Sequence, residues 1–133
     1  YRLLTEAEWE FVARGGNKTG GFEYSGHNEI EKVAWYCANA NGSTHDVGKK
    51  KPNELGICDM SGNIHEWCWD LYSQRYYSVS EQSNPVGPHS GYYRVSRGGD
   101  WGSDESSCSV VKRHYFNPAD GFGTLGFRLA RTM

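Results

Sequence analysis

Cysteine, histidine and paired carboxylates are the side chains through which this chain could do chemistry. Cys37, Cys58, Cys68 and Cys108 include no CxxC pair, so their spacing argues against a zinc site. Disulfides and buried free thiols both remain open, because four cysteines can pair in three ways and the sequence does not choose among them. Cys108 is the candidate nucleophile, but no histidine lies at an activating position, so a structural role is favoured.

Two carboxylates, Glu66 and Asp70, lie in the segment HEWCWD and fall on the same face of a strand. They could serve acid–base chemistry, but burial as hydrogen-bond acceptors for glycine-rich loops is favoured. The preceding oxygen-rich segment, DMSGNIHE, could form a Ca²⁺ site, because Asp59 and Glu66 bracket a Gly-Asn turn whose carbonyls could face the same point. Asp, Gly and Asn are also ordinary turn residues, so this signal is weak on its own.

Residues 97–130 combine a tightly specified frame with a mixed interior. The segment RGGDW opens this interval and LGFRLA closes it. Between them lie Tyr, Phe, His, Ser, Gly and Asp residues, the types that dominate binding loops. Aromatic side chains give large contact area at low entropy cost, and small polar side chains give adaptable hydrogen bonding. The pattern therefore predicts a binding surface rather than an active site.

A helix and three strands are expected to position these residues. Thr5 and Glu8 form a capping box, and Trp9, Val12 and Ala13 recur at helical spacing, which predicts a helix over residues 6–14. Alternation of apolar and polar residues predicts strands over residues 65–72, 92–99 and 125–131. Residues 16–51 are expected to form a long ordered loop with one short strand at VAWYC, and residues 73–91 a surface loop.

Composition limits the classes of protein that remain. The 133 residues suffice for one domain, and 17 glycines with many Trp and Tyr residues fit a loop-rich fold with an aromatic core. A formal net charge of -2 argues against nucleic-acid binding, which needs a basic face. No apolar run approaches the roughly 20 residues that span a bilayer.

Four ordered blocks resemble the formylglycine-generating, sulfatase-modifying family: YRLLTEAEWEFVARGG, PNELGICDMSGNIHEWCWD, RVSRGGDW and LGFRLA. The resemblance covers nearly the whole chain. It implies one domain over residues 1–133, an α+β C-type-lectin-like fold of the formylglycine-generating-enzyme subtype that is loop-rich, with short antiparallel strands and few helices. It also implies that the usual first strands of the domain lie upstream of Tyr1.

One departure from that family bears on catalysis. Oxidase members of the family carry two cysteines, five residues apart, after the RGG corner, and these bind copper. Here the corresponding positions are Ser103 and Cys108. A hydroxyl cannot replace a thiolate as a ligand for soft Cu(I), so the resemblance implies that the oxidase activity is absent.

The interval 97–130 also resembles the variable region of proteins diversified by diversity-generating retroelements, which share this fold and end in a Gly-Phe-Arg strand. There, asparagine codons of a template repeat are mutated at adenines, and most residue types in this interval are reachable in that way. Trp101, Cys108, Gly126, Phe127 and Arg128 interrupt the set as scaffold positions. The predicted ligand-binding, variable positions are Asp100, Gly102, Ser103, Asp104, Ser106, Ser107, His114, Tyr115, Phe116, Asn117, Asp120, Phe122, Gly123 and Thr124.

The resemblances lead to an expectation of a non-enzymatic binding protein whose partner is a protein on another cell or host, with no catalytic residue and no required cofactor. They imply display at the cell surface or outer membrane through a lipid anchor outside this chain. Matching the family's calcium-binding turn points to Asp59, Gly62, Ile64 and Glu66 as a structural Ca²⁺ site. The alternatives are an oxidase or related enzyme that uses Cys108, and a carbohydrate-binding module.

Overall fold

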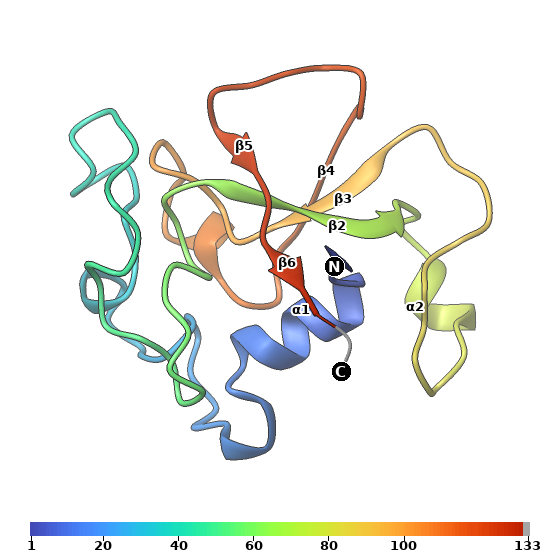
Figure 1. Ribbon diagram of the computed structural model, residues 1–133, viewed down its shortest axis with the longest axis horizontal. Coiled ribbons are helices and arrows are strands. Elements are labelled where there is room, and N and C mark those ends of the chain that lie inside the picture. Colours follow the sequence, from blue (N-terminus) through green and yellow to red (C-terminus); the bar gives the residue numbers. More distant parts are fainter. Residues whose placement is uncertain (132–133) are drawn as a thin grey trace.

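The computed structural model describes residues 1–131 and arranges them around a four-stranded sheet with one long helix against it (Figure 1). The helices are α1 (Glu6–Ala13) and the single-turn α2 (Tyr76–Val79), and short 3-10 turns occur at Gly16–Lys18, Ile30–Lys32 and Ser106–Cys108. The strands are β1 (Arg2–Leu3), β2 (His65–Leu71), β3 (Arg94–Arg97), β4 (Arg113–Phe116), β5 (Leu125–Gly126) and β6 (Leu129–Ala130). The expected loop-rich α+β fold with few helices is confirmed.

Sheet order is β4-β3-β2-β5, and β1 pairs with β6 in a separate two-stranded sheet. Strand β3 is antiparallel to both β2 and β4, with Ser96 opposite Trp67 on one side and opposite His114 on the other. Strand β5 runs parallel to β2, a direction that the expectation of antiparallel strands did not include. This register matters because cross-strand partners share a face of the sheet.

Helix α1 forms where the sequence predicts it. The Thr5 side chain accepts a hydrogen bond from the Glu8 backbone N–H, and the Glu8 carboxylate accepts one from the Thr5 N–H, so both halves of the capping box are present. Its buried face carries Glu6, Trp9 and Ala13. Trp9 and Ala13 pack with Met60, Cys68, Val95 and Val110 in the main core, on the α1 side of the sheet. We call the opposite side of the sheet the outer face.

Three sequence expectations about strands were wrong. The expected closing strand at residues 125–131 is broken into β5 and β6, which belong to different sheets. Between them Arg128 turns toward Glu66, and Phe127 is 63% exposed rather than buried as a scaffold residue. The VAWYC segment forms no strand, because Val33 and Ala34 pack instead in a second core cluster with Tyr36. Strand β4 lies in the interval that was expected to be loop.

Candidate binding surface

Strand β4 divides the predicted variable positions between two faces of the sheet. Arg113 points to the α1 side, where its guanidinium donates to the Glu6 carboxylate at 2.7 and 2.9 Å. His114 and Phe116 alternate with it and therefore point to the outer face. Tyr115 shares the face of its partner Val95, but at the edge of the sheet, so it is 47% exposed. Consecutive residues of β4 thus contribute to different parts of the surface: His114 and Phe116 to the outer face, and Tyr115 to the edge of the sheet.

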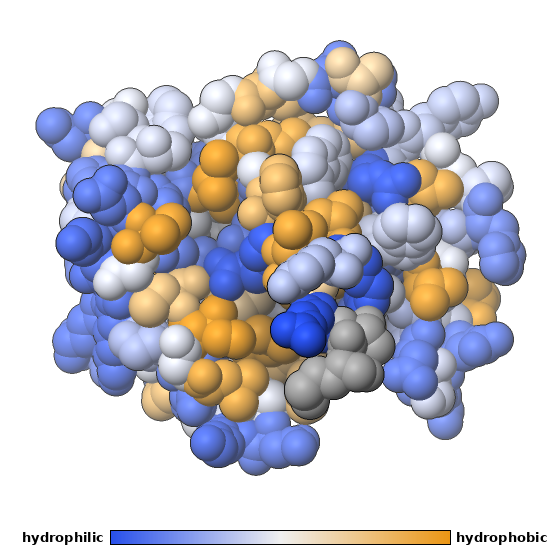
Figure 2. Space-filling model, viewed as in Figure 1, coloured by the Kyte–Doolittle hydropathy of each residue, from blue (hydrophilic) through white to orange (hydrophobic). Residues whose placement is uncertain are grey.

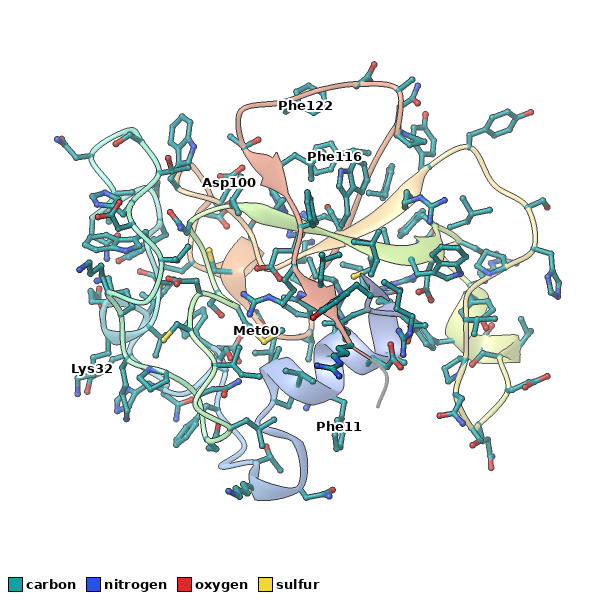
Figure 3. The ribbon with its side chains drawn as sticks, in the orientation of Figure 1. Phe11, Lys32, Met60, Asp100, Phe116 and Phe122 are labelled. Atoms are coloured by element: carbon teal, nitrogen blue, oxygen red, sulfur yellow. The ribbon has the colours of Figure 1, made fainter. Side chains whose placement is uncertain are left out.

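Five rings gather on the outer face, and we call them the outer aromatic cluster: His65, Trp67, His114, Phe116 and Phe122. The His65 ring lies 4.5 Å from that of His114 and 5.3 Å from that of Phe116. Phe116 also meets Trp67 at 6.3 Å and Phe122 at 5.4 Å, in edge-to-face and tilted arrangements. Phe116 and Phe122 lie beneath the arch of the loop that joins β4 to β5, on the side of the sheet opposite α1 (Figure 3).

Tyr115 belongs to a second group of rings at the sheet edge. Its ring stacks on Tyr72 with centroids 4.1 Å apart and tilts against Tyr93 at 5.1 Å. Tyr93 is itself exposed, and Tyr72 is half-buried. The two ring groups expose apolar surface, and Figure 2 shows apolar side chains on the outer face around β5 and beneath the β4–β5 arch.

The loop after the glycine corner is held by its own side chains. The Asp100 carboxylate accepts hydrogen bonds from the Gly102 N–H at 2.8 Å and the Ser103 hydroxyl at 3.0 Å. Asp100 is buried, so the structure gives it a role in shaping the loop rather than in contacting a ligand. Asp104 accepts from the Ser106 hydroxyl and the Ser107 N–H, and these bonds lower the pKa of its exposed carboxyl.

Exposure sorts the fourteen predicted variable positions. The exposed ones are Gly102, Asp104, Ser106, Tyr115, Asn117, Asp120, Phe122 and Gly123; the half-buried ones are Ser103, Ser107, His114, Phe116 and Thr124; Asp100 is buried. The β4–β5 loop brings Asn117 to Thr124 over the outer face, and the Thr124 carbonyl accepts from the His65 N–H at 2.8 Å. Except for Asp100, these positions therefore line one continuous stretch of loops and edge strand.

Sequence reasoning missed four residues that complete this surface. His65, Trp67, Tyr72 and Tyr93 lie outside the interval 97–130 or in its flanks, yet their rings contact the predicted variable residues. The signal that could have found them is the alternation in HEWCWDLY, which sends His65 and Trp67 to one face and Glu66 and Cys68 to the other.

Cys108 lies in the second core cluster and is fully buried. Burial, with smaller contributions from Asp100 and Asp104, raises the pKa of its thiol to about 12. The thiol is therefore protonated at neutral pH, and a thiolate is what attacks a substrate or binds a soft metal. All four cysteines are free, and Cys37 is the exposed one.

Thiol labelling should report this arrangement directly. With a disulfide reagent at pH 8 we expect Cys37 to react fastest, Cys58 slowly, and Cys68 and Cys108 only after denaturation. Because burial raises the pKa of Cys108, its labelling should stay slow at any pH that leaves the fold intact. The Cys37→Ser variant is the control, which should lose the fast phase alone. Rapid native labelling of Cys108 would contradict the structure.

Glu66 and Gly62, two of the predicted Ca²⁺ ligands, are engaged in other bonds, whereas the Oδ1 atom of Asp59 is buried without a hydrogen-bond partner among residues 1–131. The Arg128 guanidinium donates to both Glu66 oxygens, at 2.6 and 2.7 Å, and to the carbonyls of Cys58 and Asp59. The Gly62 carbonyl accepts from the Ile64 N–H at 2.9 Å. Among residues 1–131, no group of three or more His, Cys, Asp or Glu side chains could hold a metal ion. A guanidinium thus sits against the Glu66 carboxylate, so a Ca²⁺ ion at this carboxylate would have to displace Arg128.

The paired carboxylates hold the scaffold. Glu66 accepts from the Trp9 indole N–H at 2.8 Å as well as from Arg128. Asp70 accepts from the Glu6 N–H at the start of α1, at 2.7 Å, and burial raises the pKa of its carboxyl to about 6. Their donors are thus a helix end, an indole and an arginine, rather than the glycine-rich loops that the sequence suggested.

A small sheet packed on one helix, with most of the chain in loops, is the C-type-lectin-like architecture. The chain belongs to the family described as sulfatase-modifying factor enzyme 1-like domain, which matches residues 1–133. Among solved structures, Treponema denticola variable protein 1 is similar, with a TM-score of 0.83 and 40% identity over 95% of this chain and 45% of that one. The resemblance to retroelement-diversified variable proteins is thereby confirmed.

Curated relatives carry several different functions. A protein named chaperone protein LppX from Paenibacillus barcinonensis is 38% identical over 99% of this chain and 49% of its own length. The formylglycine-generating enzyme of Streptomyces coelicolor is 37% identical over 97% of this chain and 46% of its own. The chain thus spans about half the length of these two relatives. The part of the chain that the structure describes contains no helix long and apolar enough to cross a membrane.

Proposed function

We propose that this chain is a non-enzymatic binding domain whose loops and edge strand, residues 100–124, present a diversified surface to a protein ligand. The similarity to a variable protein supports a ligand-binding scaffold. On this proposal the partner is a protein on another cell or host, and display at the cell surface or outer membrane, through a lipid anchor outside this chain, would bring the surface to it.

The observation that carries the proposal is the separation of scaffold from surface. The buried pairs that hold α1 to the sheet use Glu6, Trp9, Glu66 and Arg97, all of which lie outside the predicted variable set. Eight of the fourteen predicted positions are exposed, so their side chains can change without removing a core contact. A rigid scaffold also spares the ordering cost of binding.

Two alternative functions, an oxidase and a carbohydrate-binding module, make different demands on these residues. The oxidase alternative needs a reactive Cys108, and a protonated thiol at the centre of a core cluster does not supply it. The carbohydrate-binding alternative draws on the outer aromatic cluster, whose rings could stack on sugars. Retention on a glycan array that a chelator abolishes would favour that alternative.

Sequencing this gene from many clones of its source would test the proposal. We expect substitutions to concentrate at the exposed positions, above all Gly102, Asp104, Tyr115, Asp120 and Phe122, and to trace to adenines of a template copy. Buried Glu6 and Arg97 provide the internal control and should not vary. An invariant stretch from Gly102 to Thr124 would refute diversification.

A further inference from the structure

Two buried polar atoms on the outer face have no hydrogen-bond partner within residues 1–131: the Nδ1 atom of His65 and the hydroxyl of Ser96. His65 is 4% exposed and Ser96 is fully buried. The register puts Ser96 between Trp67 and His114 across the sheet, and His65 meets the His114 ring, so both atoms lie under the outer aromatic cluster. An unsatisfied buried polar group costs about 1–3 kcal/mol, which makes two on one face of a small sheet unusual.

The neighbours of His65 decide which hydrogen-bonding role its free nitrogen plays. Its Nε2 atom faces the Asp100 carboxylate at 3.5 Å, and a carboxylate only accepts, so Nε2 carries the proton. Burial and the nearby His114 ring lower the pKa of His65 to about 4, which leaves the ring neutral at pH 7. Nδ1 is therefore an acceptor, and the Ser96 hydroxyl on the same face of the sheet can accept as well. The pair is complementary to a group with several N–H donors.

Phe122 lies at the exposed end of the cluster, against Phe116, and its side chain is free to turn. Its ring rests on Phe116 and is 47% exposed. Gly121 and Gly123 flank it in open space, since a Cβ atom at either would meet nothing within 4 Å. The backbone hydrogen bonds of this loop join Asn117 to Asp120, Phe122 to Leu125 and Thr124 to His65, so none depends on the Phe122 side chain. Rotation of the ring breaks no hydrogen bond.

The charged side chains around the outer aromatic cluster determine whether a cationic or an anionic ligand is favoured. Asp104, Glu105 and Asp120 are exposed acids in the flanking loops, and Lys112 is an exposed base. Arg113 and Arg128 are already paired with Glu6 and Glu66, whereas Arg94, the cross-strand partner of Phe116, donates to the Trp69 carbonyl and has no carboxylate partner among residues 1–131. The free charges therefore have a negative balance beside exposed aromatic faces, and both features attract a cation.

We propose that Trp67, Phe116 and Phe122, with the polar atoms of His65 and Ser96 beneath them, form a sub-site for a lysine or arginine side chain of the bound protein. Phe122 turns aside to admit the cationic group, which donates to His65 Nδ1 and Ser96 Oγ. His65, Trp67 and Ser96 lie outside the predicted variable positions, so the base of this sub-site is constant, whereas Phe116 and Phe122 belong to the predicted variable set. The inference rests on the proposed binding function and names the chemistry of its partner.

A titration followed by NMR would test the sub-site with small probes: n-butylguanidinium, n-butanol and butyrate, which share one alkyl chain. We expect n-butylguanidinium to give saturable shifts of the His65 and Trp67 side-chain signals, at concentrations up to about 100 mM, and butyrate to give none. The Ser96→Ala variant should weaken guanidinium binding about fivefold while thermal stability stays unchanged or rises, because a hydroxyl without a partner is removed. A purely structural Ser96 would give the opposite pair of results.

Two further variants sharpen the outcome. Trp67→Leu should also weaken guanidinium binding, whereas Ser78→Ala, which removes an exposed hydroxyl bonded to the Arg75 carbonyl, should change nothing. Equal responses to butyrate, or unchanged binding in Ser96→Ala, would overturn the sub-site and leave a resident water as the partner of the two atoms. Protein binders selected from a random display library that show no Lys or Arg preference would overturn it too, while leaving the proposed function intact.

Discussion

Replacement of Glu6 by alanine should remove about 3–5 kcal/mol of folding free energy, the usual effect of breaking a buried ion pair. The Glu6 carboxylate is 1% exposed and accepts from Arg97 Nε at 3.0 Å and from two nitrogens of Arg113. Arg97 is equally buried; in the alanine variant it keeps the Glu10 carboxylate and the carbonyls of Val110 and Lys112, but its Nε loses its acceptor. Against a total stability of about 5–15 kcal/mol, this loss brings the domain close to unfolding.

Chemical denaturation of the variant and of a matched control would measure the effect. Glu29→Ala removes an exposed carboxylate that pairs with Lys32 at 3.0 Å, and such surface pairs contribute about 0–1 kcal/mol. Equal losses in the two variants would show that the Glu6 network does not stabilise the fold. The Glu6→Gln variant should fall between them, because it keeps an acceptor and loses the charge.

The second large effect is expected at Gly62, where alanine should destabilise the domain by about 3 kcal/mol or more. Gly62 has a φ of +73°, and a Cβ atom there would lie 2.3 Å from the Trp35 carbonyl oxygen. That carbonyl also accepts from the Asn63 N–H at 2.7 Å, so it cannot move away freely. The residue fixes the start of β2 against the long loop, and through it the position of His65.

Gly42 offers an unusually close control for this variant. It has the same φ of +73°, but a Cβ atom there would meet nothing within 4 Å. Gly42→Ala should therefore show only the strain of the left-handed conformation, about 1 kcal/mol. Thermal melts of the two variants separate backbone strain from the clash with Trp35. Similar melting temperatures would mean that the loop carrying Trp35 moves aside and that its contact with a Cβ atom at position 62 costs little free energy.

Helix α1, strand β2 and the glycine corner after β3 could be predicted from the sequence, because each depends on residues close together along the chain. Helix α1 formed as expected because its cap, Thr5 with Glu8, and its apolar spacing are contained within the helix. Strand β2 was predicted over residues 65–72 and spans His65–Leu71, because its alternation places one row of side chains in the core. The glycine corner after β3 was also expected, and both Gly98 and Gly99 have positive φ.

Long-range contacts account for what could not be predicted. The closing strand breaks because Arg128 turns to Glu66, a partner 62 positions away that no local pattern reveals. Strand β4 was hidden because its residues, His114 to Phe116, are the types expected of binding loops, and its pairing with β3 decides its conformation. The outer aromatic cluster likewise depends on register, which brings β2 and the β4–β5 loop together only in the folded chain.

The pairing of β1 with β6, in which Arg2 lies opposite Ala130, has a practical consequence for protein engineering. Antiparallel partners lie about 5 Å apart, so a short linker could join residues 2 and 130 directly. The ring-bearing arch lies on the other side of the sheet from α1 and would remain accessible in such a joined chain (Figure 1). The loops over the outer face could therefore be randomised independently of the joined strands β1 and β6.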